Sequence, residues 1–109
     1  MSKFDDVIAK CAADLTEMGG YDANLLNAVA KGLGPSIYND DSKLVAASDK
    51  AELDRVKQNF LIKKLGLADS PALDEAIAKV AATYNKRQKQ RPVFYYLLVK
   101  ELGQEKAYQ

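Results

Sequence analysis

Histidine is absent from this 109-residue sequence, and cysteine occurs only once. Without histidine there is no Ser-His-Asp or Cys-His catalytic group, no histidine-bound metal and none of the usual proton shuttles of neutral pH. A single cysteine, Cys11, excludes an intrachain disulfide and a thiolate zinc cluster. Cys11 lies at helical spacing from Phe4, Ile8 and Leu15, which predicts a buried, unreactive thiol.

Long hydrophobic runs are also missing. No apolar stretch approaches the roughly 18–20 residues that cross a bilayer, and the sequence turns acidic at Asp5 and Asp6, where a signal peptide would become apolar. We therefore expect a cytoplasmic protein without membrane contact. The oxygen-rich segment 39–41 lacks the glycine and distal glutamate of a calcium loop. No metal and no cofactor are expected.

The composition is that of an ordinary globular protein. Hydrophobic residues make up 48% and charged residues 28% of the chain, and its length suits one domain, 1–109. A chain of this size buries roughly 65% of the surface that it exposes when unfolded. It can therefore form a core without disulfides or metal.

Helix signals recur along the whole sequence. Asp22 and Asp49 are suited to cap helices, and Ser70 followed by Pro71 marks another helix start. Inward-facing positions of the third helix include Val56, Phe60 and Ile62, and Glu75 and Lys79 are spaced to pair on the outside of the fourth. The predicted helices span 2–18, 22–32, 49–65, 70–84 and 92–102, with a short helical turn near 36–39.

The last of these segments is ambiguous, because its β-branched and aromatic residues at 93–99 would also suit a buried strand. Pro92 at its start and Gly103 at its end favour a helix, and no second strand-like run exists to pair with it. Being apolar on all sides, it should be the most buried helix. We predict an all-α fold, a compact bundle of about five short helices.

The motif Lys-x-Leu-Gly occurs three times, at 31–34, 63–66 and 100–103. Its spacing invites comparison with helical repeats. A cation near a helix end and a glycine just beyond it are also the ordinary signals of helix termination. Because the intervening segments do not match, we interpret the motif as three helix ends.

Charge is unevenly divided along the chain. Residues 1–54 carry a net charge of −5 and residues 55–109 a net charge of +6, although the total is only +1. Four cations with no neighbouring acid precede the apolar run of the last helix, and they are the candidate anion- or partner-binding residues: Lys86, Arg87, Lys89 and Arg91.

This basic segment admits several interpretations. Its cations could contact phosphates and the nearby aromatic rings could stack bases, as in a nucleic-acid-binding module, but the pI of about 7.7 is far below the range typical of such proteins. It could instead bind a protein partner or the acidic half of a second copy. A solvated linker, or pairing of the two charged halves within one molecule, would also explain the pattern.

Five sequence blocks resemble a known family: KGLGPSIYN at 31–39, SDK at 48–50, ELDRVK at 52–57, NFLIKKLGL at 59–67 and VFYYLLVK at 93–100. They are similar to a family of short bacterial proteins designated domain of unknown function 2853. The resemblance covers nearly the whole chain and is weakest at 81–90. It implies a bacterial, stand-alone, mostly helical protein, and it implies no activity, substrate or cofactor.

Together these observations predict a non-catalytic protein that acts by binding a macromolecule or by self-association. Nucleic-acid binding through segment 86–91 is the alternative. An enzyme relying on carboxylates, lysine or tyrosine is a second and less favoured alternative, because no spacing singles out a catalytic pair.

Overall fold

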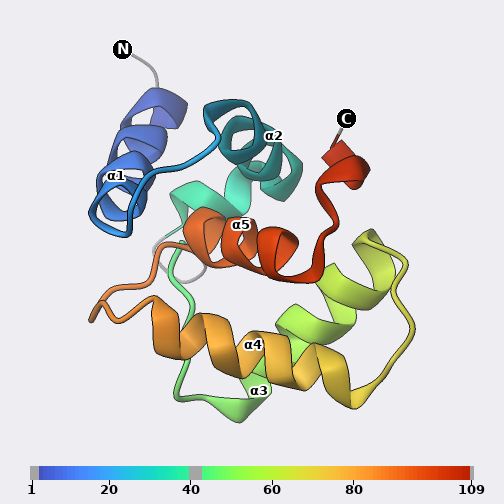
Figure 1. The fold of residues 1–109 in the computed structure, drawn as a ribbon. Helices are drawn as coiled ribbons and strands as arrows, with labels where there is room; N and C mark the ends of the chain where they lie inside the picture. Colours follow the sequence, from blue (N-terminus) through green and yellow to red (C-terminus); the bar gives the residue numbers. More distant parts are fainter. Residues whose placement is uncertain (1–2, 40–42, 109) are drawn as a thin grey trace.

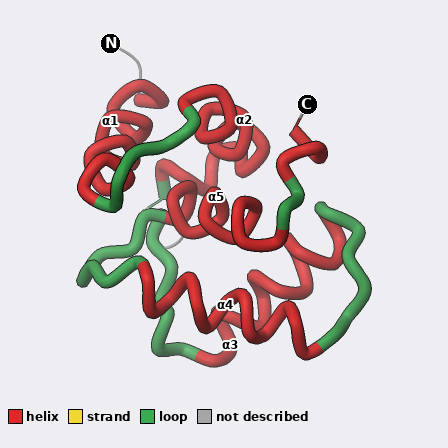
Figure 2. Tube along the Cα trace, viewed as in Figure 1, coloured by secondary structure: helices red, strands yellow, loops and turns green. Residues whose placement is uncertain are grey.

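The computed structural model describes residues 3–39 and 43–108, and within these ranges the chain is helical without a strand (Figures 1 and 2). The predicted all-α fold is confirmed. The α-helices are α1 (Lys3–Glu17), α2 (Ala23–Leu33), α3 (Lys50–Val56), α4 (Pro71–Thr83) and α5 (Arg91–Leu102). Two 3₁₀ turns, η1 (Gly34–Tyr38) and η3 (Glu105–Tyr108), and a π-helical segment, η2 (Lys57–Lys64), complete the described secondary structure.

Helix α5 runs through the middle of the molecule, with α1 and α2 on one side and α3 and α4 on the other (Figure 1). Nearly every residue from Pro92 to Val99 is buried, so the prediction that this segment forms the most buried helix is confirmed. Burial on all sides requires an apolar surface all round the helix, which is why its aromatic and β-branched residues are tolerated here.

The helix ends follow local signals. Asp22 caps α2, because its Oδ1 accepts hydrogen bonds from the backbone amides of Asn24 at 3.0 Å and Leu25 at 3.2 Å. Asp49 caps α3 by accepting from the Ala51 amide at 2.9 Å. Ser70 occupies the N-cap position of α4 without a side-chain capping bond, so only its position was predicted correctly.

The three Lys-x-Leu-Gly motifs do mark helix ends. Gly34, Gly66 and Gly103 have φ of 64°, 71° and 66°, values that glycine adopts without the steric cost of a side chain. The predicted end of the second helix at Gly32 was wrong: α2 continues through Gly32 and ends at Leu33.

The predicted third helix is continuous, but at Lys57 it changes from α- to π-helical hydrogen bonding. Val56 and Leu61 are both fully buried, whereas Ile62, which was predicted to face inward, is only half-buried. Residues five apart are about 140° apart around an α-helix, but the i→i+5 bonds of a π-helix bring them nearly one above the other. The π-helical turns therefore place Leu61 inside the core and leave Ile62 packed against its edge.

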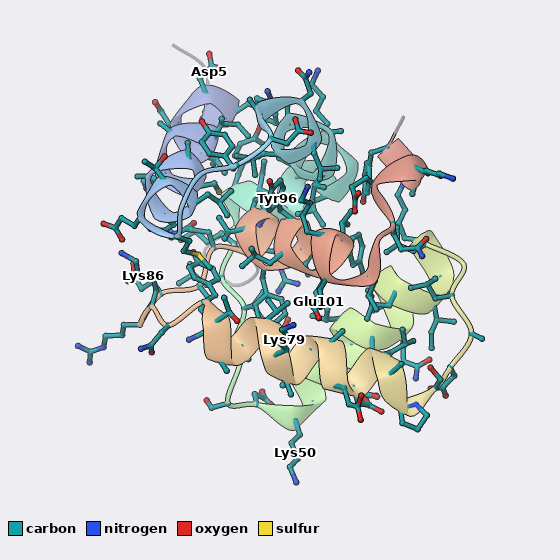
Figure 3. The ribbon with its side chains drawn as sticks, in the orientation of Figure 1. Asp5, Lys50, Lys79, Lys86, Tyr96 and Glu101 are labelled. Carbon is teal, nitrogen blue, oxygen red and sulfur yellow. The ribbon has the colours of Figure 1, made fainter. Side chains whose placement is uncertain are left out.

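An ion pair links the last two α-helices. Lys79 Nζ on α4 lies 3.1 Å from Glu101 Oε1 on α5 (Figure 3). The predicted pairing of Lys79 with Glu75 along the same helix was therefore wrong, because the carboxylate of Glu101 lies across the helix interface. None of the helices in the described ranges combines the length and the apolarity needed to cross a bilayer.

Candidate functional site

The basic segment singled out in the sequence forms the connection between α4 and α5, which projects beyond the helices at the left of Figure 2. We call residues 85–90 the basic loop. The four predicted site residues do not form one cationic patch. Two of them are held in ion pairs with acids of the N-terminal half, a third bonds within the loop, and Arg87 extends into solvent.

Arg91 is a structural cation at the start of α5, and its side chain is only 11% exposed. Its Nη2 lies 2.8 Å from Glu52 Oε1, and its Nη1 donates to the Tyr95 hydroxyl at 2.8 Å. Burial alone would lower the pKa of Arg91, but the hydrogen bond to Glu52 and the surrounding charges raise it overall. The guanidinium is therefore permanently charged and points into the protein.

Lys86 joins the basic loop to α1. Its ammonium group bonds to the carboxylate of Glu17 and lies 3.9 Å from Asp14 Oδ1, and Figure 3 shows its side chain reaching toward the end of α1. The hydrogen bond to Glu17 raises the pKa of Lys86. Because both partners are partly exposed, this pair contributes little to stability, but it neutralises the cation.

The other two cations differ in exposure. Lys89 Nζ donates to the backbone carbonyl of Lys86 at 2.7 Å, which folds its side chain back onto the basic loop. Arg87 is exposed and has no ion-pair or hydrogen-bond partner among residues 3–39 and 43–108. Of the four predicted residues, Arg87 is therefore the one available to a ligand.

Tyr84 fixes the conformation of the basic loop. Its hydroxyl donates to the carboxylate of Asp14 and accepts from the backbone amide of Gln90 at 3.0 Å. Burial, reinforced by the bond to Asp14, raises the pKa of Tyr84, so the phenol stays protonated and can donate. Tyr84 ends the segment 70–84 that was predicted as a helix, but nothing in the sequence indicated this role, because Asp14 is 70 residues away and no local motif connects Tyr84 with Gln90.

A second set of bonds holds the far side of the loop. The backbone amide of Val45 donates to the Lys89 carbonyl at 2.8 Å, and the amide of Arg91 donates to the Lys43 carbonyl at 2.8 Å. These bonds surround an antiparallel bridge between Leu44 and Gln90. The basic loop is thus anchored at both ends to different parts of the chain.

An open hollow of about 460 Å³ lies beside the anchored loop and is lined by Asp14, Lys86, Arg87, Gln88 and Gln90. Its lining carries charges of both signs together with two side-chain amides. Such a surface can bind a polar group that offers both hydrogen-bond acceptors and a negative charge.

Three other groups with shifted pKa values are poorly suited to proton transfer at neutral pH. Burial raises the pKa of Cys11 and of Tyr108 to about 12 in each case, and burial also raises the pKa of Tyr95. General acid–base catalysis works best when a pKa lies near the working pH, and these shifts lead away from it. Within the described residues no group of three or more cysteine, aspartate or glutamate side chains is placed to hold a metal ion; Asp40 and Asp41 lie outside those residues.

A family model described as "Protein of unknown function (DUF2853)" matches residues 6–106, a range that runs from α1 into η3. Comparison with curated proteins finds no match.

Proposed function

We propose a binding role without catalysis for this chain, which belongs to the DUF2853 family. In this proposal it is a bacterial, cytoplasmic protein, and its basic loop binds an acidic segment of another protein. One observation carries the proposal. The loop projects from the helices and is anchored by Tyr84 and by the pairing with 43–45, yet it leaves the guanidinium of Arg87 exposed.

An anchored loop favours recognition because its backbone has already lost most of its conformational entropy before a partner arrives. The planar guanidinium of Arg87 is suited to bind a carboxylate through two parallel hydrogen bonds. The amide of the neighbouring Gln88, which lines the same hollow, adds donors beside it.

Two alternatives fit the charge distribution less well. Nucleic acids bind through several phosphates at once, whereas Lys86 and Arg91 are already paired with acids and Asp14 lies in the same hollow. Self-association through these cations would have to displace the pairs that Lys86 and Arg91 already form with Glu17 and Glu52 within one molecule.

The titration behaviour of the core supports a role without catalysis. The raised pKa values of Cys11 and Tyr108 keep both groups protonated at neutral pH. Outside the core, Lys57 is held charged by a different cause, because hydrogen bonds from its ammonium to Asp69 and Asp74 raise its pKa.

The proposal is tested by fluorescence anisotropy with a labelled short peptide of alternating glutamate and glycine at low and at physiological salt. Substituting Arg87→Ser should weaken binding about tenfold, equivalent to about 1.4 kcal/mol for the loss of a charge-assisted hydrogen bond. The matched control is Lys50→Ser, which removes one exposed positive charge from α3, far from the loop in Figure 3.

Equal losses in both variants would mean that net charge, and not the loop, governs binding. A labelled single-stranded RNA is titrated in parallel. Tighter binding of the RNA, with a steep dependence on salt and loss in the Arg87→Ser variant, would replace the protein partner with a nucleic acid.

A further inference from the structure

A separate cavity of about 220 Å³ lies on another part of the molecule, where the ends of α2 and η2 meet α5 and the C-terminal turn η3. Figure 1 shows η3 folded back beside α2. Six of the lining residues give the cavity its shape and chemistry: Gly32, Asn59, Phe60, Lys64, Tyr95 and Tyr108.

Three of these residues give the cavity aromatic walls. The rings of Phe60 and Tyr95 are stacked with their centroids 4.2 Å apart and their planes tilted by 30°. Tyr108 closes another side, since its Cε1 would lie 3.7 Å from a Cβ placed on Gly32. An aromatic lining of this kind favours a planar ring as ligand, because rings prefer offset-stacked or edge-to-face contact.

The polar residues of the cavity reach it because η2 is π-helical. Asn59 and Lys64 are five residues apart and would lie about 140° apart around an α-helix. The i→i+5 geometry of η2 aligns them instead, so that both line the same cavity. π-helical turns are often found at functional sites.

Lys64 is the charged side chain in the lining of the cavity, and its charge is positive. Lys64 is exposed, and its Cε would lie 4.0 Å from a Cβ placed on Gly32, so the side chain extends over the end of α2. The last carbonyls of a helix lack partners within it, and at the end of α2 the carbonyl of Lys31 accepts a hydrogen bond from the amide of Gly34. The nearby acids Asp22 and Glu105 line a different hollow with Tyr108, so the Tyr108 ring borders both spaces.

We propose that this cavity binds a small planar aromatic carboxylate, its ring held among Phe60, Tyr95 and Tyr108 and its carboxylate paired with Lys64. The size of the cavity limits the ligand to about one ring, because pockets for drug-sized molecules begin at about 300 Å³. The side-chain amide of Asn59 supplies a donor for the second carboxylate oxygen. This site does not depend on the binding role of the basic loop.

The test uses probes that share one ring and differ in charge: benzoate, benzamide and benzylamine, followed by amide chemical shifts in two-dimensional NMR spectra. Benzoate should bind in about the millimolar range expected for so small a ligand, and it should shift the backbone amide of Gly32 and the side-chain amide of Asn59. The neutral and cationic probes should bind about fivefold more weakly, a ratio at the upper end for one exposed ion pair. Cyclohexanecarboxylate, which lacks the aromatic face, should also bind more weakly than benzoate.

Two variants locate the site. Lys64→Gln should weaken benzoate binding about fivefold, whereas the matched control Lys63→Gln, which removes the adjacent exposed cation outside the cavity lining, should leave it unchanged. Gly32→Leu places a side chain in the cavity at a helical position where leucine is favoured over glycine, and it should abolish binding of all probes while circular dichroism stays native.

Four results would overturn the proposal. They are equal affinity for benzoate and benzamide, tighter binding of benzylamine, equal effects of the two lysine variants, and benzoate binding that leaves the Gly32 and Asn59 signals unmoved.

Discussion

At the scale of single residues, the contrast between Arg87 and Arg91 shows how differently one residue type can serve within one segment. Arg91 is paired with Glu52 and Tyr95, whereas Arg87 is exposed. The sequence identified both as candidate binding residues, because local charge density is the same around them. What separates them is the position of Glu52, which is distant in sequence and therefore invisible to a local pattern.

Tyr84 illustrates the same difficulty for a neutral residue. It ends the segment 70–84 that was predicted as a helix, and it is fully buried. Its hydroxyl, however, connects Asp14 of α1 with the Gln90 amide of the basic loop. A buried tyrosine hydroxyl needs a hydrogen-bond partner, so the sequence indicated that partners exist without indicating which.

The thiol of Cys11 yields a prediction about alkaline stability. Burial, with a smaller contribution from Asp14, raises the pKa of Cys11 from 9.0 to about 12. Between these values the unfolded chain loses the thiol proton while the folded chain keeps it, so the unfolded state binds fewer protons and stability falls as pH rises. The fall due to Cys11 approaches about 1.4 kcal/mol per pH unit.

The measurement is urea unfolding of the wild type and of Cys11→Ala at several pH values from about 8 to about 12. The free energy of unfolding of the variant should decline less steeply above pH 9.0, whatever its offset at neutral pH. Parallel curves for the two proteins would show that the thiol titrates normally in the folded state.

At the scale of elements, the helices were predictable because their signals are local. Caps such as Asp22 and Asp49 and stops such as Gly103 act within one turn. The π-helical segment was not anticipated, since the segment 49–65 was predicted as a single helix with Val56, Phe60 and Ile62 facing inward. Its signal is present in the sequence as apolar residues five apart, Val56 with Leu61 and Phe60 with Leu65.

The register of η2 can be tested with two neighbouring truncations. Leu61 is fully buried and Ile62 only half-buried, so Leu61→Ala should destabilise the fold by about 2–5 kcal/mol and Ile62→Ala by about 1 kcal/mol. Urea unfolding followed by circular dichroism measures both. A larger loss of stability for Ile62→Ala than for Leu61→Ala would indicate an α-helical register. In that register Asn59 and Lys64 would not line the same cavity.

At the scale of the whole molecule, the charge split is at least partly an internal complementarity. Lys86 pairs with Glu17 and Arg91 with Glu52, so each pair joins the basic half of the chain to the acidic half. The sequence presented this pairing as one of several alternatives. It could not decide among them, because the decision depends on how α1 and α3 pack around the ends of α4 and α5.

This arrangement predicts opposite outcomes for two arginines four positions apart. Arg91→Ala leaves the largely buried carboxylate of Glu52 without this partner and should cost about 3 kcal/mol. Arg87→Ala removes an exposed side chain and should change the free energy of unfolding by no more than about 0.5 kcal/mol. Thermal and urea unfolding of both variants provide the comparison, and similar losses would mean that Arg91 is not a structural cation.

The most direct test of the account is amide hydrogen exchange in the basic loop and its anchors, because the proposed binding role depends on a loop that is ordered before it meets a partner. The amides of Val45, Gln90 and Arg91, which donate to Lys89, Tyr84 and Lys43, should be protected in the wild type. Tyr84→Phe should accelerate exchange at Gln90 more than at Val45. Exchange of all three amides at the rate of an unfolded chain would contradict the account.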